Sequence, residues 1–402
     1  MLVNQIYPIL NTAITETLGQ NDLVNENLQN VVDIGDRVFS DMNLVDKYVK
    51  SLINHIGKVV FVDRPYKGQA PSVLMDGWEY GSILEKISVE LPDSKVNETW
   101  GADGTGLVDG VEYNPNIFRA PKTPRVKFFN KMDTYAIDLS FAARQVKQSF
   151  SSAQQLNAFF SMLEGKVAMR RTIDYDNLIM RTINNMIAGT IHNAYGASDE
   201  STLSAGSHAR AVNLLYLYKQ ETSDNTVTAQ NYMTKPEFIR FAALKISLWS
   251  DRLEKASKAF NIGGQTRFTP KDLQHIVLLS EFEKAANVYL QSDTFHNELT
   301  KLPKAETVTF WQGSGESYSL AQTSGIHIVT SDPVEGTGSQ IEVAMSNILG
   351  VMFDRDALGV NNINNRVYTK FNEVGEFYTN FYKNDARYFN DYDENFIVFF
   401  VA

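Results

Sequence analysis

The residue types that most often carry out chemistry are few in this sequence, and none stands in a catalytic or metal-binding spacing. Six histidines and no cysteine occur in 402 residues, which excludes disulfides, thiolate metal sites and cysteine nucleophiles. No two histidines have the H-E-x-x-H spacing that puts two zinc ligands on one helix face. Phosphate-binding glycine loops and the G-x-S-x-G turn of serine hydrolases are missing as well. We therefore predict no catalytic residue, no cofactor and no metal site.

One acidic stretch near the end of the chain begins like a calcium-binding loop. Asp391, Asp393 and Asn395 alternate with other residues, as the first ligands of such a loop do. Phe396 then stands where the loop needs glycine, and Ala402 stands where it needs a bidentate glutamate. We interpret the stretch as an acidic surface loop that binds no calcium.

Charge is distributed unevenly along the chain. The formal net charge is −10, which argues against a protein that wraps nucleic acid by neutralising its phosphates. Residues 1–36 hold five acids and no base, whereas residues 119–131 hold five bases and no acid. Either both segments are solvated surfaces, or they are complementary patches that meet between copies of the chain. The second interpretation makes five bases candidate inter-subunit contacts: Arg119, Lys122, Arg125, Lys127 and Lys131.

Two stretches of alternating apolar residues predict a pair of strands that would carry this basic segment. Ile87, Val89 and Leu91 alternate with polar neighbours, and so do the apolar residues between 135 and 141. The roughly 30 residues between the two stretches are rich in glycine and proline, and a loop of this length is usually a functional projection. We predict that residues 82–142 form a long two-stranded arm that reaches away from the body.

A long helix is predicted after the arm. Ser151 and Ser152 stand three residues before Gln154 and Gln155, which gives two overlapping capping boxes. An apolar stripe with helical spacing continues from there to Gly189. At 1.5 Å per residue, about 37 residues span about 55 Å. Because neither a strict heptad nor an all-apolar face is present, we interpret this helix as a structural spine.

Helical and strand patterns alternate further along, which predicts an α+β core. A capping box, Thr234-Lys-Pro-Glu237, begins a helix that we expect to stop at Gly263-Gly264. Residues 269–280 have the pattern of a turn that leads into a buried strand, and residues 281–290 that of a helix. From residue 308 onwards, strand patterns dominate.

The last 37 residues are unusually aromatic. Between Arg366 and Ala402 there are 12 Phe or Tyr residues, and the stretch ends in the apolar run 396–402. Aromatic β-rich segments of this kind bury both faces of a sheet or seal a contact with another subunit. We therefore predict that this tail is tied into a sheet.

The sequence lacks the signals that would direct it through a membrane. No lysine or arginine precedes Arg37, so the basic region of a secretory signal is missing. No apolar run approaches the roughly 20 residues needed to cross a bilayer. We expect a protein that is soluble when made and has no membrane partner, and the lack of cysteine fits assembly in a reducing cytoplasm.

The order of these parts resembles the major capsid proteins of tailed bacteriophages, those with the Hong Kong 97 type of shell fold. Two stretches carry the resemblance best. Residues 269–280, with the helix after them, look like the strand and helix of that family's axial domain. Residues 347–359 look like the part where the chain leaves the axial domain and re-enters the sheet of the peripheral domain.

The resemblance implies an α+β Hong Kong 97-like capsid fold with an N-terminal arm, an extended β-hairpin loop, a long spine helix, a peripheral β-sheet domain and an axial α+β domain. It implies these boundaries: an N-terminal arm over 1–60, a lead-in over 61–81, the extended hairpin loop over 82–142, the spine helix over 143–194, the axial domain over 195–345, and the return to the peripheral sheet over 346–402.

The resemblance also implies a structural protein and not an enzyme. Copies would form pentamers and hexamers that tile a shell around packaged double-stranded DNA, without sequence-specific binding. A scaffolding protein and a portal are the expected partners, with assembly in the host cytoplasm and the virion capsid as the final location. Some relatives cross-link neighbouring subunits through a Lys–Asn isopeptide bond. Residues of suitable type here are Lys122, Lys127, Asn361, Asn362, Asn364 and Asn365.

Two alternatives stay open at this point. An encapsulin-type compartment shell shares the same fold, although such chains are typically shorter. A soluble α+β enzyme without a recognisable motif is the alternative from another class. Microscopy of the purified protein, alone and with a scaffold, distinguishes a shell protein from an enzyme.

Overall fold

The structure is a computed structural model that describes most of the chain after residue 121. The described residues are 11, 14, 15, 68, 70–73, 84–92, 94, 122–142, 153–196, 200–291, 302–312, 325–334 and 336–402. The chain divides into two compact units, one of Met1–Arg64 with Ser152–Leu163 and the other of Pro65–Ser151 with Glu164–Ala402. The predicted N-terminal arm and the tip of the predicted hairpin loop lie outside the described residues.

In the first unit, the described residues are helical. Asn11, Ile14 and Thr15 are in helical conformation, and the Thr15 hydroxyl donates a hydrogen bond to the Asn11 carbonyl at 2.7 Å. The long helix α5, Ala153–Tyr195, begins in this unit. All other elements described below belong to the second unit.

A five-stranded sheet forms the centre of the second unit. Its order is β4-β12-β9-β5-β6. β12 runs parallel to β4 and antiparallel to β9, and β5 runs antiparallel to β9 and parallel to β6. The bounds are β4 Ala211–Asn213, β5 Gln274–Leu279, β6 Glu306–Val308, β9 Ile348–Asp354 and β12 Phe396–Phe400. Every residue of β9 and β12 is buried, which is why these segments are continuous apolar runs and not alternating ones.

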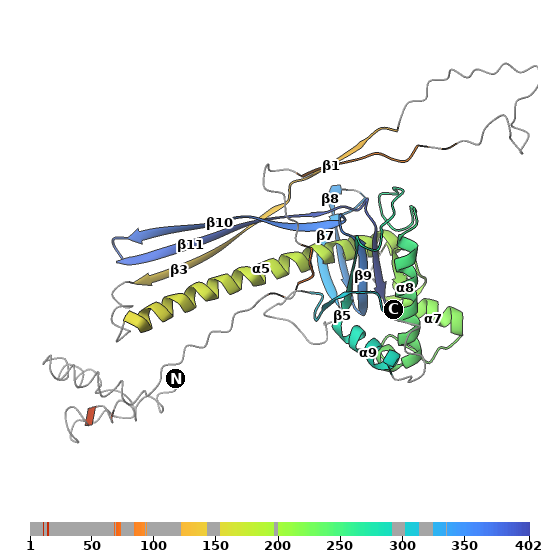
Figure 1. Ribbon diagram of the computed structural model, residues 1–402, viewed down its shortest axis with the longest axis horizontal. Helices are drawn as coiled ribbons and strands as arrows, with labels where there is room; N and C mark the ends of the chain where they lie inside the picture. The colour runs from red at the N-terminus through yellow and green to blue at the C-terminus, as the bar shows by residue number, and fades with distance from the viewer. Residues whose placement is uncertain are drawn as a thin grey trace, which may run out of the picture. The chain divides into compact units, whose positions relative to one another are not determined.

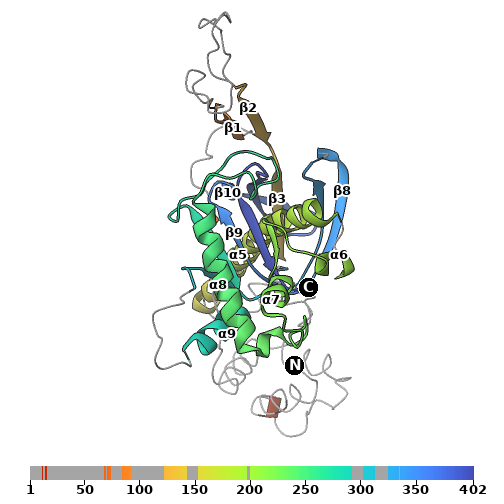
Figure 2. The same cartoon turned by 90° about the vertical axis from the view of Figure 1, so that its right-hand side faces the viewer.

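Helices cover both faces of this sheet (Figures 1 and 2). Phe399 of β12 packs against Trp249 of α8 with ring centroids 6.4 Å apart, and Phe400 packs against Tyr195 of α5 at 5.8 Å. Adjacent residues of a strand point to opposite faces, so α8 and the end of α5 lie on opposite sides. The shorter helices are α6 Glu200–Ser204, α7 Leu214–Thr222, the 3-10 helix η2 Tyr232–Thr234, α8 Pro236–Leu253 and α9 Ser280–Gln291.

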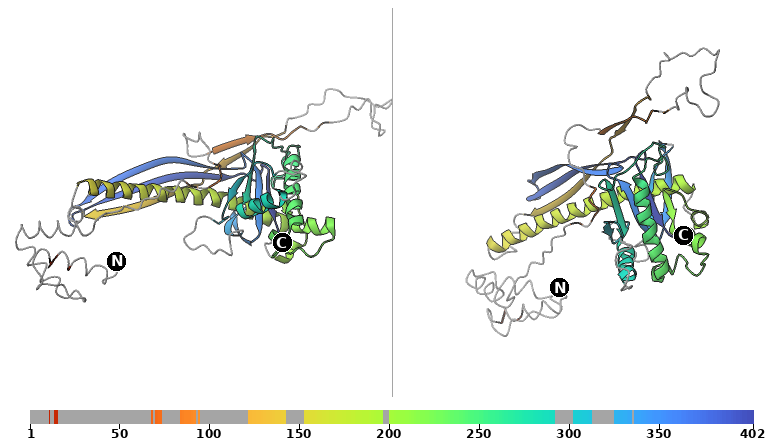
Figure 3. Two further views of the ribbon diagram at one scale, coloured as in Figure 1. Left: turned by 60° about the horizontal axis from the view of Figure 1, so that its bottom comes forward. Right: turned by 45° about the vertical axis from the view of Figure 1, so that its right-hand side comes forward.

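A second sheet, of order β10-β11-β3, lies against α5 (Figure 3). Its strands are β3 Met132–Ala142, β10 Leu358–Asn372 and β11 Phe377–Asn390, and both pairings are antiparallel. Two side chains and one backbone group of α5 take part in the contact: Arg171 lies over the Tyr382 ring, Arg181 lies over the Tyr388 ring, and the backbone carbonyl of Thr182 accepts a hydrogen bond from the Asn390 side chain at 2.7 Å. The even-numbered residues of β11 therefore face the helix.

Two two-stranded sheets complete the described part of this unit. β1 Leu84–Ser88 pairs antiparallel with β2 Arg125–Phe129, and β7 Ile326–Asp332 pairs antiparallel with β8 Gly336–Met345. We call the β1–β2 pair the ribbon. No helix in the described residues is long and apolar enough to cross a membrane.

The predicted hairpin pairs its strands differently in the structure. Residues 135–141 do form a strand, but this strand is β3, which pairs with β11 and not with the segment around Ile87. The partner of Ile87 is Val126, in the short basic segment. Alternation identifies a strand but not the strand that it pairs with. The apolar residues of β3 pair with the even-numbered residues of β11, so both sets lie on the sheet face that is turned to α5.

The helix boundaries also differ from two of the predictions. α5 continues through Gly189 to Tyr195. Gly189 does not end the helix but allows close packing, because a Cβ there would lie 2.7 Å from the Tyr392 hydroxyl. The predicted capping residue Thr234 lies in η2, where its hydroxyl donates to the Asn231 carbonyl, and α8 begins after Lys235 without a side-chain cap. The predicted strand and helix over 269–290 are confirmed as β5 and α9.

The tail is tied into a sheet as predicted, but its last strand joins a different sheet from the one expected. β10 and β11 belong to the three-stranded sheet, whereas β12 lies between β4 and β9 in the five-stranded sheet. The predicted segment 346–402, the return to the peripheral sheet and the C-terminus, thus contributes strands to two sheets, with β9 and β12 in the five-stranded one. A strand that is apolar on both faces needs two covered faces, and among the described sheets the five-stranded one offers them.

Candidate functional site

A cluster of buried or half-buried charged side chains lies where the ribbon meets the turn between β11 and β12. The Lys86 ammonium is 2.8 Å from Asp391 Oδ2 and 4.0 Å from Glu394 Oε1. The Lys127 ammonium is 3.1 Å from Asp391 Oδ1 and 2.7 Å from Asp393 Oδ2. We call these five residues the polar junction. Lys86 and Lys127 are directly opposite each other in the ribbon, so both ammonium groups leave the same face.

The two aspartates of the polar junction are buried, so the charges beside them decide whether they stay ionised. Asp391 and Asp393 are only 3% and 4% exposed. Burial alone would raise the pKa of Asp391, but the charges of Lys86 and Lys127 outweigh it and hold this pKa below its usual value. Burial raises the pKa of Glu394, and Arg267 and Lys86 offset that rise only in part.

The turn side of the polar junction is built into the core. The backbone N–H groups of Ile262 and Gly263 both donate to the Tyr392 carbonyl at 3.0 Å. A Cβ on Gly263 would lie 1.6 Å from Asp393 Oδ1, so only glycine fits this approach. Gly263 is therefore a packing residue of the junction, and not the end of α8, which stops at Leu253.

A polar loop connects the same turn to the ribbon. Asn261 donates to the Gln265 carbonyl at 2.8 Å and to Asn395 Oδ1 at 3.4 Å. Gln265 in turn donates to Glu90 Oε1 at 3.1 Å, and Glu90 lies just beyond β1. The ribbon is thus held at its base by both ionic and neutral polar contacts.

The acidic stretch 391–395 is therefore not the surface loop that we predicted. Asp391, Asp393 and Asn395 are all buried, and the two lysine ammonium groups supply the positive charge that a calcium ion would supply in a metal loop. The described residues contain no cluster of metal-ligating side chains. Sequence patterns missed this because the cations come from strands that are distant along the chain.

The five predicted inter-subunit contacts are in different surroundings. Arg119 lies outside the described residues. Lys122, Arg125 and Lys131 are exposed, and the Arg125 guanidinium is 4.0 Å from Glu90 Oε1. Lys127 pairs with Asp391 and Asp393 of its own chain. Within the subunit, its acidic partners are therefore not those of an adjacent copy.

Sequence reasoning missed the outward face of the ribbon. Residues alternate across each strand, so Lys86 and Lys127 face the body while Ile87, Val126 and Phe128 face away. Ile87 and Phe128 are 65% and 64% exposed. The alternation of bases and apolar residues in Arg125–Phe129 is the sequence signal for this face.

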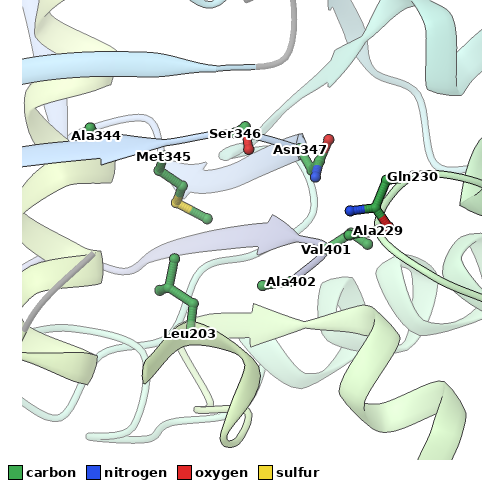
Figure 4. Close-up of a pocket in the computed structure, with 9 residues that line it drawn as sticks. All are labelled: Leu203, Ala229, Gln230, Ala344, Met345, Ser346, Asn347, Val401 and Ala402. Carbon is green, nitrogen blue, oxygen red and sulfur yellow. The ribbon is translucent and has the colours of Figure 1, made fainter. Parts of the chain in front are cut away.

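A pocket of about 320 Å³ lies beside the end of β12, away from the polar junction (Figure 4). Its lining comes from Leu203, Ala229, Gln230, Ala344, Met345, Ser346, Asn347, Val401 and Ala402. Ser346 is the single hydroxyl among these side chains, and no histidine or carboxylate side chain accompanies it. The side chains of this lining therefore supply no general base that could activate Ser346 as a nucleophile.

Comparisons with known proteins agree with this geometry. A family model described as Phi29-like phage major capsid protein matches residues 10–400. Among solved structures, a chain from the capsid structure of Staphylococcus phage Andhra aligns with a TM-score of 0.50 and 8% identity, covering 86% of this chain and 87% of that one.

A chain from a structure of the head fiber and inner core protein gp22 of native bacteriophage P68 also aligns with a TM-score of 0.50, at 10% identity, covering 86% of this chain and 87% of that one. A search of curated proteins gave no match. At these identities the structural likeness shows the fold alone, which is the predicted Hong Kong 97-like capsid fold. The family model, over nearly the whole sequence, favours neither a compartment shell nor an enzyme. The chain therefore belongs to the Phi29-like phage major capsid protein family and is a structural protein of a phage shell.

Proposed function

We propose that copies of this chain form pentamers and hexamers that close into a shell around packaged double-stranded DNA. A scaffolding protein and a portal take part, and assembly occurs in the host cytoplasm. The protein acts without catalysis. Its net charge of −10 suits a wall that encloses DNA without binding it tightly, because tight binding depends on neutralising phosphates with lysine and arginine.

The observation that best supports self-assembly is the outward face of the ribbon. Ile87 and Val126 are directly opposite each other, and Phe128 follows on the same face. All three are exposed although their strands are held on the body by the opposite face. Contiguous exposed apolar residues mark interaction sites. A second copy is the occupant that a shell protein requires, and aromatic anchors such as Phe128 commonly dominate such contacts.

Substitution of this face tests the proposal. Ile87→Thr with Val126→Thr keeps β-branched residues in the strands while removing apolar surface. We expect a folded subunit by circular dichroism and a several-fold loss of particles when assembly with scaffold is followed by light scattering and electron microscopy. Val329→Thr, on the exposed strand β7, is the matched control and is expected to assemble normally. Normal assembly of the double variant would contradict the proposed contact.

A further inference from the structure

We infer that the polar junction is a latch that fixes the orientation of the ribbon on its own subunit. Lys86 and Lys127 are then positioning residues, because they decide the direction in which Ile87, Val126 and Phe128 are presented. This consequence for assembly rests on the proposed function. The latch itself is a property of the single subunit.

Apart from the two residues that join β2 to β3 and the hydrogen bond from the Tyr388 N–H to the Lys131 carbonyl at 3.3 Å, the ribbon depends on side chains for its orientation. Its two strands form a sheet of their own, so no backbone hydrogen bonding between strands joins β1 or β2 to another sheet in the described residues. An isolated two-stranded ribbon is marginally stable in water. Its inward face makes one aromatic contact, between Phe129 and Phe389 with ring centroids 5.3 Å apart, and Lys86 lies over the same Phe389 ring.

The two sides of the latch differ in rigidity. The acids sit on a turn whose backbone is hydrogen-bonded to residues 262 and 263 and whose packing excludes any Cβ at Gly263. The lysines sit on a ribbon with much weaker support. A contact between a fixed buried acid and a less supported strand sets the position of the strand, and its loss moves the strand and not the acid.

The charges are arranged so that both lysines are needed. Asp391 receives both ammonium groups, one on each carboxylate oxygen. A buried ion pair gives little net stability compared with an apolar contact, but removal of one partner leaves a buried charge without compensation. The arrangement therefore favours one docked position of the ribbon, because a position that separates the lysines from the acids leaves buried carboxylates without a counter-charge.

Distance measurements on the unassembled subunit test the latch. The chain has no cysteine, so cysteines introduced at two exposed positions, Thr123→Cys beside β2 and Ala256→Cys on the body, are the sole sites for spin labels. We expect a narrow distribution of label distances in the otherwise unchanged protein. The variant Lys86→Met with Lys127→Met keeps the side-chain length but removes both charges, and we expect a clearly broader distribution.

Two controls make the result specific. Lys131→Met with Lys370→Met removes the same charge from exposed positions and should leave the distribution narrow. Lys86→Arg with Lys127→Arg keeps the charges and should restore most of the narrow distribution. If the double methionine variant does not fold, Lys127→Met alone is measured in its place. A distribution that stays as narrow as that of the unchanged protein, in whichever of these variants folds, overturns the latch.

Assembly is measured separately, so that the two proposals can fail independently. With scaffold, the double methionine variant is expected to give a several-fold smaller yield of closed particles and more open or irregular ones. If the unchanged protein does not assemble, the proposed function fails while the distance result still stands. If the distribution broadens but closed particles form normally, the latch exists but does not govern how copies meet, which overturns the positioning role.

Discussion

The five-stranded sheet and the ribbon use similar apolar residues in opposite ways. In β12, every residue from Phe396 to Phe400 is buried, and helices cover both faces. In the ribbon, Ile87 and Phe128 remain exposed although the strands are firmly paired. The first region belongs to the hydrophobic core of the subunit. The second holds apolar surface that a single subunit leaves uncovered, which is the expected division in a protein whose copies complete one another.

The three-stranded sheet is intermediate between these two regions in how far its apolar residues are buried. Near β12, its residues Ala386 and Phe389 are fully buried. At the far end of β10, Val367 and Phe371 are exposed, and the Phe371 ring lies 4.7 Å from the ring of its cross-strand neighbour Tyr378. Burial thus decreases along a single sheet, from the subunit core to a free end.

The largest effect is expected from truncating a side chain of β12. Phe399→Ala removes a fully buried ring from the central sheet and should lower the free energy of unfolding by about 3–5 kcal/mol. Denaturant titration of the unassembled subunit measures the change. Phe371→Ala, the same substitution at the exposed end of β10, should change it by no more than about 1 kcal/mol. Equal effects at the two sites would remove the contrast between these regions.

A smaller loss of stability is expected from a substitution at Gly263, which packs against the turn between β11 and β12. Gly263→Ala would place a Cβ 1.6 Å from Asp393 Oδ1, so the turn must shift, at a cost of about 1–3 kcal/mol. Gly206→Ala is the control, because nothing lies within 4 Å of a Cβ built there. Thermal unfolding of the two variants should show a clear loss for the first alone. A stable Gly263→Ala protein would mean that the turn is not fixed against the loop beneath it.

The smallest effect is an acid dependence of stability. The pKa of Asp391 is lowered in the folded protein, so its contribution is present above the unfolded value near 3.8 and is lost as pH falls through the lowered folded value. The charged groups that face Asp391 are Lys86, Lys127, Asp393 and Glu394, and Glu394 is in turn faced by Arg267 and Asp354. Glu394 has a raised pKa, so its contribution has the opposite sign: it is present at low pH and lost as pH rises.

Asp391→Asn isolates the first contribution. The variant should be less stable than the unchanged protein at pH 7, and the difference should shrink as pH falls below about 4, near the unfolded pKa of aspartate. Urea titrations at a series of pH values measure it. In the background of Lys86→Met with Lys127→Met, the same substitution should lose this dependence on pH or reverse its sign, since burial then raises the pKa of Asp391 and the lysine charges no longer lower it. A difference that stays constant down to acid pH would show that Asp391 is not held charged by the ribbon.

The sequence by itself determined the elements whose patterns depend on local physics. A long apolar stripe predicted α5, the run 269–290 predicted β5 and α9, and the aromatic tail predicted strands. These follow from helical and strand periodicity, which neighbours along the chain set directly. The order of the elements was sufficient for the resemblance to phage capsid proteins, and the family match confirms that resemblance.

Tertiary structure alone decided which strands pair and which charges meet. β3 pairs with β11 and β12 joins β9, because pairing depends on surfaces that come together only in the folded chain. The polar junction unites Lys86 and Lys127 with Asp391, residues that stand 305 and 264 positions apart in the sequence. A charged residue looks the same in a sequence whether it is solvated or buried. Its partner and its burial, and so its role, are fixed only when distant segments are packed against each other.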